Sequence, residues 1–170
     1  MKDIARQQMS IKVESMDMLN AQIQMEGKAS ATYLAMASWC DQRGFEGSAN
    51  FLYAQAAEER EHMMKIFKFV NDCGGNALSP EISSVNHDFS SLEEIFETAL
   101  SKEIEVTKSI NQIVAAAKKN NDFGVESFLQ WFITEQLEEE KAMRDILDLF
   151  EIMGRDGIAL KFIDERISAE

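Results

Sequence analysis

The sequence predicts an all-α fold, a bundle of four long helices with one long connection between the second and the third. The 170 residues contain one proline and eight glycines, so long stretches are free of helix breakers. Alternating Val, Ile and Thr, the pattern typical of strands, is missing. Four segments instead repeat apolar residues at steps of three and four, the spacing of one helix face. We expect a single domain over residues 1–170, because this length suits one.

Helix breakers divide the chain into four long segments. The predicted helices span roughly residues 13–43, 49–73, 91–119 and 123–153. Their C-terminal breakers are Gly44 with Gly47, Gly74 with Gly75, the run from Asn120 to Asp122, and Gly154. Two overlapping capping boxes, Ser90 with Glu93 and Ser91 with Glu94, open the third helix.

A short fifth helix is expected at residues 155–167, where Asp156 is placed to act as its N-cap. Its apolar residues are Ile158, Leu160, Phe162, Ile163 and Ile167. At the other end of the chain, residues 1–12 form an N-terminal extension, to which the sequence assigns no role.

The connections between the long helices are short, long and short. Residues 74–89 contain the only proline, Pro80, and show no helical period. At ~3.3 Å per residue this segment can reach ~50 Å, whereas a helix of about 28 residues is ~42 Å long. The segment can therefore cross the full length of the bundle and join two antiparallel hairpins, a topology found among ferritin-like four-helix bundles.

The charge of the chain excludes some classes of partner. There are 17 Lys and Arg residues against 30 Asp and Glu, a net charge of −13. Nucleic acids and anionic membranes would be repelled, whereas cations would be attracted. The charged N-terminus lacks the apolar core of a secretory signal, and no apolar run approaches the ~18 residues of a membrane span. Two cysteines make no disulfide framework, so we expect a cytoplasmic location.

The apolar stripe of each long helix is interrupted by polar residues near its midpoint. These residues are Glu26 in the first helix, Glu59 and His62 in the second, Glu103 in the third, and Gln136 and Glu139 in the fourth. In each half of the chain the lone Glu is followed, 33 residues later, by a pair at positions i and i+3. Because the midpoints of bundled helices meet at one level, the six side chains should converge on a dinuclear metal site.

An empty cluster of this kind would be unstable, since one unpaired carboxylate in a low dielectric already costs several kcal/mol. Two Fe²⁺ ions would neutralise four carboxylates, and oxygen ligands with one imidazole suit iron or manganese better than zinc or copper. A lone Glu on a stripe is usually a solvated edge residue, and one Glu-x-x-His occurs by chance. Four interruptions at matched depth with an internal repeat are far more specific.

Residues beside this set have two readings each. Tyr33, two turns after Glu26, can bond a metal-bound oxygen, supply an electron, or simply pack with a satisfied hydroxyl. Three further carboxylates each directly precede a candidate ligand in the sequence: Glu58, Glu135 and Glu138. On a helix they therefore point about 100° away from that ligand. They can hold a third metal or form an ordinary acidic surface.

Several segments resemble the bacterial non-haem ferritins, and the similarity spans roughly residues 19–167. The matching runs include Glu58-Glu59-Arg60-Glu61-His62-Met63, Phe128-Leu129-Gln130-Trp131, Glu138-Glu139-Glu140-Lys141 and Phe162-Ile163-Asp164. The resemblance implies a ferroxidase centre with Glu26, Glu59 and His62 on the first iron and Glu59 bridging. Glu103 and Glu139 would hold the second iron, with Gln136 close by.

The resemblance also implies a third iron site at Glu58, Glu135 and Glu138, with Glu139 contributing, and a tyrosine, Tyr33, beside the centre. Members of the family form hollow twenty-four-subunit shells, oxidise Fe²⁺ with O₂ or hydrogen peroxide, and store a ferric mineral inside. Bacterioferritins carry a haem-ligating Met where this chain has Arg60, so haem is not expected.

Two other functions are compatible with the same residues. One is a di-iron oxidase or peroxidase of the ferritin-like superfamily that stores no mineral. The other is an acidic helical interaction module whose buried polar residues set the register of its helices.

Overall fold

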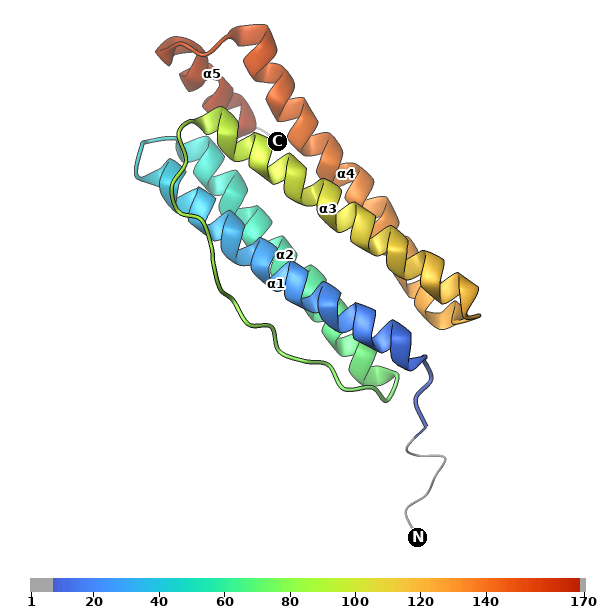
Figure 1. The fold of residues 1–170 in the computed structure, drawn as a ribbon. Coiled ribbons are helices and arrows are strands. Elements are labelled where there is room, and N and C mark those ends of the chain that lie inside the picture. Colours follow the sequence, from blue (N-terminus) through green and yellow to red (C-terminus); the bar gives the residue numbers. More distant parts are fainter. Residues whose placement is uncertain (1–7, 169–170) are drawn as a thin grey trace.

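The computed structural model describes residues 8–168, which form five helices and no strand (Figure 1). The helices are α1 (Val13–Asp41), α2 (Glu46–Asp72), α3 (Leu92–Lys119), α4 (Phe123–Met153) and α5 (Gly157–Ile167). α1 and α2 form one antiparallel hairpin, α3 and α4 form the other, and the connection after α2 runs along the first hairpin to the start of α3 (Figure 1). The predicted all-α bundle with a long crossover and a short fifth helix is confirmed.

The start of α2 differs from the prediction, because Gly47 lies inside the first turn of the helix rather than before it. A Cβ at position 47 would lie 2.0 Å from the carbonyl oxygen of Asp164 in α5. The missing side chain therefore serves close helix packing and does not break the helix. Gly44, whose φ is +78°, makes the turn between α1 and α2.

The carboxylate of Asp164 joins α5 to the N-terminus of α2. It accepts hydrogen bonds from the backbone N–H groups of Gly47 (3.1 Å) and Ser48 (2.7 Å) and from the Ser48 hydroxyl (2.6 Å). The first N–H groups of a helix have no partner within the helix, and the helix dipole favours a negative charge there. The Phe-Ile-Asp run at the end of the chain thus has a structural role.

Ser91 is the N-cap of α3, since its hydroxyl accepts a hydrogen bond from the N–H of Glu94 (3.1 Å). The Glu94 carboxylate reaches back to the N–H of Ser90 (2.6 Å), whereas Glu93 pairs with Arg155 (2.6 Å). Ser91 therefore caps the helix, but neither predicted box is closed in full, because Glu94 bonds to Ser90 and not to the N–H of Ser91.

The predicted cap of α5 is also confirmed, because Asp156 accepts from the N–H groups of Ile158 and Ala159. Of the predicted apolar residues of α5, Ile163 and Ile167 are buried, whereas Ile158 and Phe162 are exposed on this single chain.

Side chains of α1 hold the crossover in place. The side-chain oxygen Oδ1 of Asn20 accepts from the N–H of Leu78 (2.8 Å), and Oε1 of Gln24 accepts from the N–H of Glu81 (2.8 Å). Near the end of the crossover, the indole N–H of Trp39 donates to the carbonyl oxygen of Phe89 (3.0 Å). Several backbone groups of this segment without secondary structure are thus bonded to side chains of a neighbouring helix.

Residues 1–7 of the predicted N-terminal extension lie outside the described part of the chain. The rest of the extension contacts both hairpins: the N–H of Ser10 donates to the carbonyl oxygen of Cys73 (2.8 Å), and the N–H of Lys12 donates to the Asp122 carboxylate (2.8 Å). Ile11 is buried in the adjacent core.

The interior of the bundle consists of two apolar clusters. In α1 the first cluster contains Tyr33, Met36, Ala37, Trp39 and Cys40, and the second contains Leu19 and Ile23; each also includes the parts of α2, α3 and α4 that face these residues. In every long helix the polar residues of the interrupted stripe lie between the two clusters. Within residues 8–168, no helix has both the length and the apolar character needed to span a bilayer.

Replacing Gly47 with alanine should destabilise the fold by about 2 to 3 kcal/mol, because α5 or α2 must shift to relieve the contact with Asp164. Gly124→Ala in α4 is the control, since a Cβ there meets nothing within 4 Å. Thermal unfolding followed by circular dichroism should show a lower midpoint for the first variant and an unchanged or higher one for the second. Equal midpoints for both variants would contradict the packing described here.

Candidate metal centre

The six side chains that interrupt the stripes are all buried. Their exposed fractions are 0 to 5 % for Glu26, Glu59, His62, Glu103, Gln136 and Glu139. They are buried because they occupy the core positions of helices whose other core positions are apolar. Ionisable groups are almost never this buried unless they are paired or bind a metal.

Glu26, Glu59 and His62 form the first cluster. One ligand atom from each residue lies within 4.8 Å of the others. Glu26 Oε2 and both carboxylate oxygens of Glu59 have no hydrogen-bond partner. Buried polar atoms are nearly always satisfied, so these three oxygens indicate a missing partner. A divalent cation fits the donor set, which consists of carboxylate oxygens and one imidazole nitrogen.

Glu103 does not belong to this cluster of ligand atoms, but its charge acts on Glu59 and two neighbours hold its carboxylate. It accepts hydrogen bonds from the Tyr33 hydroxyl and from the amide nitrogen of Gln136 (3.1 Å). Gln136 also donates to the backbone carbonyl of Glu103 (3.2 Å). Tyr33 and Gln136 therefore orient this carboxylate.

The carboxylates raise one another's pKa values. Burial raises the pKa of Glu26 well above its usual range, and the negative charge of Glu59 adds to this effect. Burial, and after it the negative charge of Glu103, also raises the pKa of Glu59 well above its usual range. The same two causes raise the pKa of Glu139 to about 8. Burial raises the pKa of Glu103 as well, although the bonds from Tyr33 and Gln136 oppose the shift. Without a cation, the cluster therefore retains protons at neutral pH.

Glu58, His62, Glu135 and Glu139 form a second cluster, again with ligand atoms within 4.8 Å of one another. Glu58 and Glu135 are half-buried, so this cluster is closer to solvent than the first. His62 belongs to both clusters, which the sequence did not suggest. Glu138 is exposed and belongs to neither, and its predicted part in a third site stays a prediction.

Aromatic rings enclose the imidazole that the clusters share. The rings of Trp131 and Phe132 lie edge-on to His62, with centroids at 5.4 and 5.9 Å. The outer side of Trp131 faces Lys65, whose Nζ lies 3.1 Å from the ring centroid. Trp131 therefore packs between the imidazole and a surface cation.

Three polar residues of the site lie outside the patterns that predicted the ligands. Gln22 donates to Glu26 (2.8 Å), Gln55 donates to Glu58 (3.2 Å), and Thr107 lies 3.4 Å from the Gln136 amide nitrogen. Each of the three lies four residues from a ligand on the same helix, namely Glu26, Glu59 and Glu103, which was the signal that the sequence offered.

Known proteins resemble this chain over most of its length. The family described as ferritin-like domain matches residues 16–153. A probable bacterial non-heme ferritin-like protein of Haemophilus influenzae is 42% identical over 148 residues, covering 87% of this chain and 90% of that protein. A bacterial non-heme ferritin of Escherichia coli is 37% identical over 158 residues, which cover 93% of this chain and 96% of that protein. An open pore ferritin of Archaeoglobus fulgidus superimposes with a TM-score of 0.91 at 35% identity, covering 95% of this chain and 98% of that one.

The stability of the metal-free protein should fall as pH rises from about 4.5 to 8. The pKa of Glu139 is about 8 in the folded chain, whereas an unfolded Glu titrates near ~4.3. The folded state therefore binds more protons in this interval, and its stability is greatest below ~4.3 and declines up to the folded pKa. Midpoints of thermal unfolding at several pH values in chelator measure the decline.

Glu139→Gln should flatten that decline, since the glutamine cannot titrate. Asp148→Asn is the matched control, because Asp148 is an exposed carboxylate on the same helix. An equal slope in wild type and in Glu139→Gln would mean that burial does not hold the proton on Glu139.

Proposed function

The chain belongs to the ferritin family, and on this premise we propose that it is an iron-storage protein that oxidises Fe²⁺ within the subunit and stores the ferric product. The observation that carries the proposal is that neither carboxylate oxygen of Glu59 has a hydrogen-bond partner, although both Glu26 and Glu103 are close enough to act on its pKa. A buried carboxylate with neither oxygen hydrogen-bonded, close to further carboxylates and an imidazole, is suited to bridge two cations.

Each ion would have its own set of side chains. Glu26 and His62 complete the first position, Glu103 and Glu139 complete the second, and Glu59 belongs to both. Gln136 is uncharged and keeps Glu103 in place through its amide. Binding must displace the protons that the buried carboxylates retain, so uptake of Fe²⁺ releases protons into the surroundings.

Two iron ions held side by side give up two electrons together. With O₂ as oxidant, two Fe²⁺, one O₂ and two protons yield two Fe³⁺ and one H₂O₂. With peroxide, two Fe²⁺, one H₂O₂ and two protons yield two Fe³⁺ and two H₂O. The contribution of the chain is to place both ions within reach of one oxidant, which makes the two-electron step effectively intramolecular.

Tyr33 is proposed to serve this chemistry through Glu103. Burial, followed by the charge of Glu103, raises the pKa of Tyr33 well above its ordinary value, so the phenol stays protonated and donates. Its hydroxyl contacts a ligand of the second ion, from where it can also supply an electron.

We propose further that Glu58, Glu135 and Glu138, together with Glu139, receive an ion beside the pair. Glu58 and Glu135 are half-buried and Glu138 is exposed, so they lead from the buried pair towards the surface. Stored iron needs such a route away from the oxidation site.

The proposed assembly is a hollow shell of twenty-four subunits in the cytoplasm. The single chain exposes large apolar residues that an assembly would cover, among them Leu34, Phe123, Leu137 and Ile158, each more than half exposed. Exposed apolar side chains of this size are typical of subunit interfaces.

Removing two ligands of the first ion tests the oxidation. Glu59→Ala combined with His62→Ala should lower the rate of aerobic Fe²⁺ oxidation at least about 100-fold, since outer-shell changes alone cost about 10- to 100-fold. Stopped-flow absorbance of Fe³⁺ measures the rate. Glu61→Gln, an exposed change on the same helix, should leave it unchanged, and a wild-type rate in the double variant would refute the site.

Storage is tested separately from oxidation. After aerobic loading, purified protein should retain many more than two iron ions per subunit. Native mass spectrometry should show the mass of a shell of twenty-four subunits. An assembly that turns over Fe²⁺ but retains only the ligand-bound ions would instead be a di-iron oxidase.

A further inference from the structure

Gln22 is a fully buried glutamine on α1, one turn before Glu26, and both ends of its amide are bonded. Its Nε2 donates to Glu26 Oε1 at 2.8 Å. Its Oε1 accepts from the hydroxyl of Ser109 on α3 at 2.5 Å. A continuous chain of hydrogen bonds thus runs from a half-buried serine on one hairpin to a buried carboxylate on the other.

We propose that Gln22 is a positioning residue that fixes the carboxylate of Glu26 for iron; this inference rests on the proposed function. The bond to Nε2 occupies Oε1 and leaves Oε2, which has no partner, available as a ligand. A metal ligand held by a hydrogen bond from outside the coordination sphere loses less rotational freedom when the ion binds.

Ser109 gives the amide its direction. With the hydroxyl donating to Oε1, the Gln22 amide presents its N–H to Glu26. The reversed amide would bring a carbonyl oxygen against a carboxylate oxygen, two acceptors without a proton between them. Ser109 therefore acts on Glu26 through Gln22 and not by contact.

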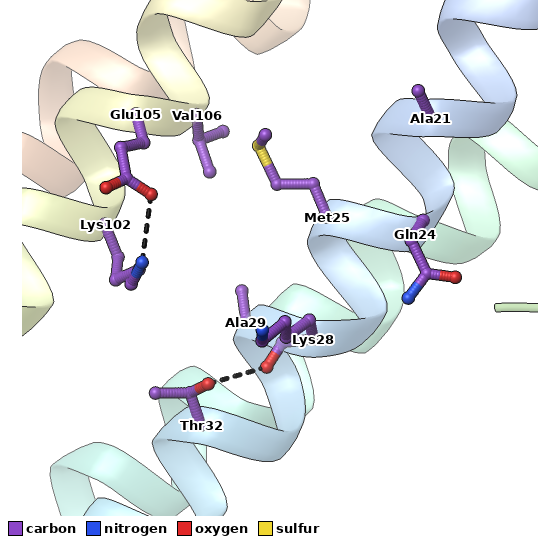
Figure 2. A pocket seen from close by; sticks show the side chains of 9 residues that line it. All are labelled: Ala21, Gln24, Met25, Lys28, Ala29, Thr32, Lys102, Glu105 and Val106. Atoms are coloured by element: carbon purple, nitrogen blue, oxygen red, sulfur yellow. Dashed lines mark hydrogen bonds and ion pairs between the residues drawn. The ribbon is translucent and has the colours of Figure 1, made fainter. Parts of the chain in front are cut away.

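Met25 packs beside this bond. Its sulfur lies 3.8 Å from Gln22 Nε2, and its side chain extends from α1 towards Val106 on α3 (Figure 2). Both residues line a groove of about 290 Å³ between the two helices. Because Gln22 and Glu26 are both fully buried, the bond between them lies in a low dielectric, where a hydrogen bond to a charged group is stronger.

The second half of the chain has no counterpart of Gln22. The residue one turn before Glu103 is Ala99, and Glu103 is held instead by Gln136 and Tyr33. Loss of Gln22 should therefore weaken one ion of the pair and spare the other, which a general loss of packing would not do.

The test is an anaerobic titration of the assembled protein with Co²⁺, followed by calorimetry and by the visible absorption of the bound ion. Gln22→Leu should weaken the position formed by Glu26, Glu59 and His62 about tenfold and change the other by less than about twofold. In Fe²⁺ oxidation, the KM for iron should rise more than kcat falls.

Ser109→Ala should weaken the same position about threefold, a smaller effect because Gln22 itself remains. In the Gln22→Leu background it should add nothing. Ser101→Ala, an exposed serine two turns earlier on α3, is the control and should behave as wild type. If Gln22→Leu does not assemble, Ser109→Ala alone decides.

Two results would overturn the inference. In the first, the Gln22→Leu and Ser109→Ala variants bind both ions as tightly as wild type does. In the second, the variants weaken both metal positions equally. In either case wild type still binds two ions, so the proposed function stands. Wild type that binds no Co²⁺ tightly would overturn the proposed function as well.

Discussion

Burial of four carboxylates in one layer between two apolar clusters is the constraint on which the rest of the molecule depends. The layer has two stable conditions, because its charge can be neutralised by protons or by cations. Burial and mutual repulsion raise the pKa values of Glu26, Glu59, Glu103 and Glu139, which is the mark of the first condition. Exchange between the two conditions couples metal uptake to proton release. For the same reason, the buried carboxylates destabilise the folded chain at neutral pH when no ion is present.

Such a layer needs a frame that keeps the two hairpins at a fixed distance, and the contacts at the ends of the bundle provide it. Near one end, Lys12 contacts Asp122 across the hairpins. Near the other, Trp39 bonds to the last residues of the crossover, and Asp164 of α5 caps α2. These groups are remote from the polar layer, yet they determine how closely the ligands from the two hairpins approach. We infer that their contribution to the site is geometric and that none of them takes part in its chemistry.

The sequence predicted the helices and the burial of the polar residues near their midpoints, because both follow from the spacing at which apolar residues recur along the chain. It misplaced the start of α2, since Gly47 looks like a breaker until the backbone of Asp164 is seen against it. It also missed Gln22, which lies off the stripe of α1 and acquires its role only from Ser109, a residue 87 positions away. The sharing of His62 between two clusters depends on the direction of one ring, and no spacing rule encodes that.

The internal repeat differs at both positions of the pair, since His62 is matched by Glu139 and the position of Glu59 is taken by a glutamine. Glu59 of the first half is matched by Gln136 in the second, 77 positions later in the chain. A second Glu would bring the layer to five negative charges and provide a second bridge. With glutamine the proposed ligands carry four, which balance two Fe²⁺ ions but not two Fe³⁺ ions. Oxidation therefore leaves the buried pair with excess positive charge in a low dielectric, which favours departure of the product. The half-buried carboxylates of Glu58 and Glu135 cluster with His62 and Glu139 closer to solvent, where they can bind the ferric ion that leaves the pair. A site that must retain its iron through many turnovers would need the opposite balance, so the substitution favours storage over a resident di-iron cofactor.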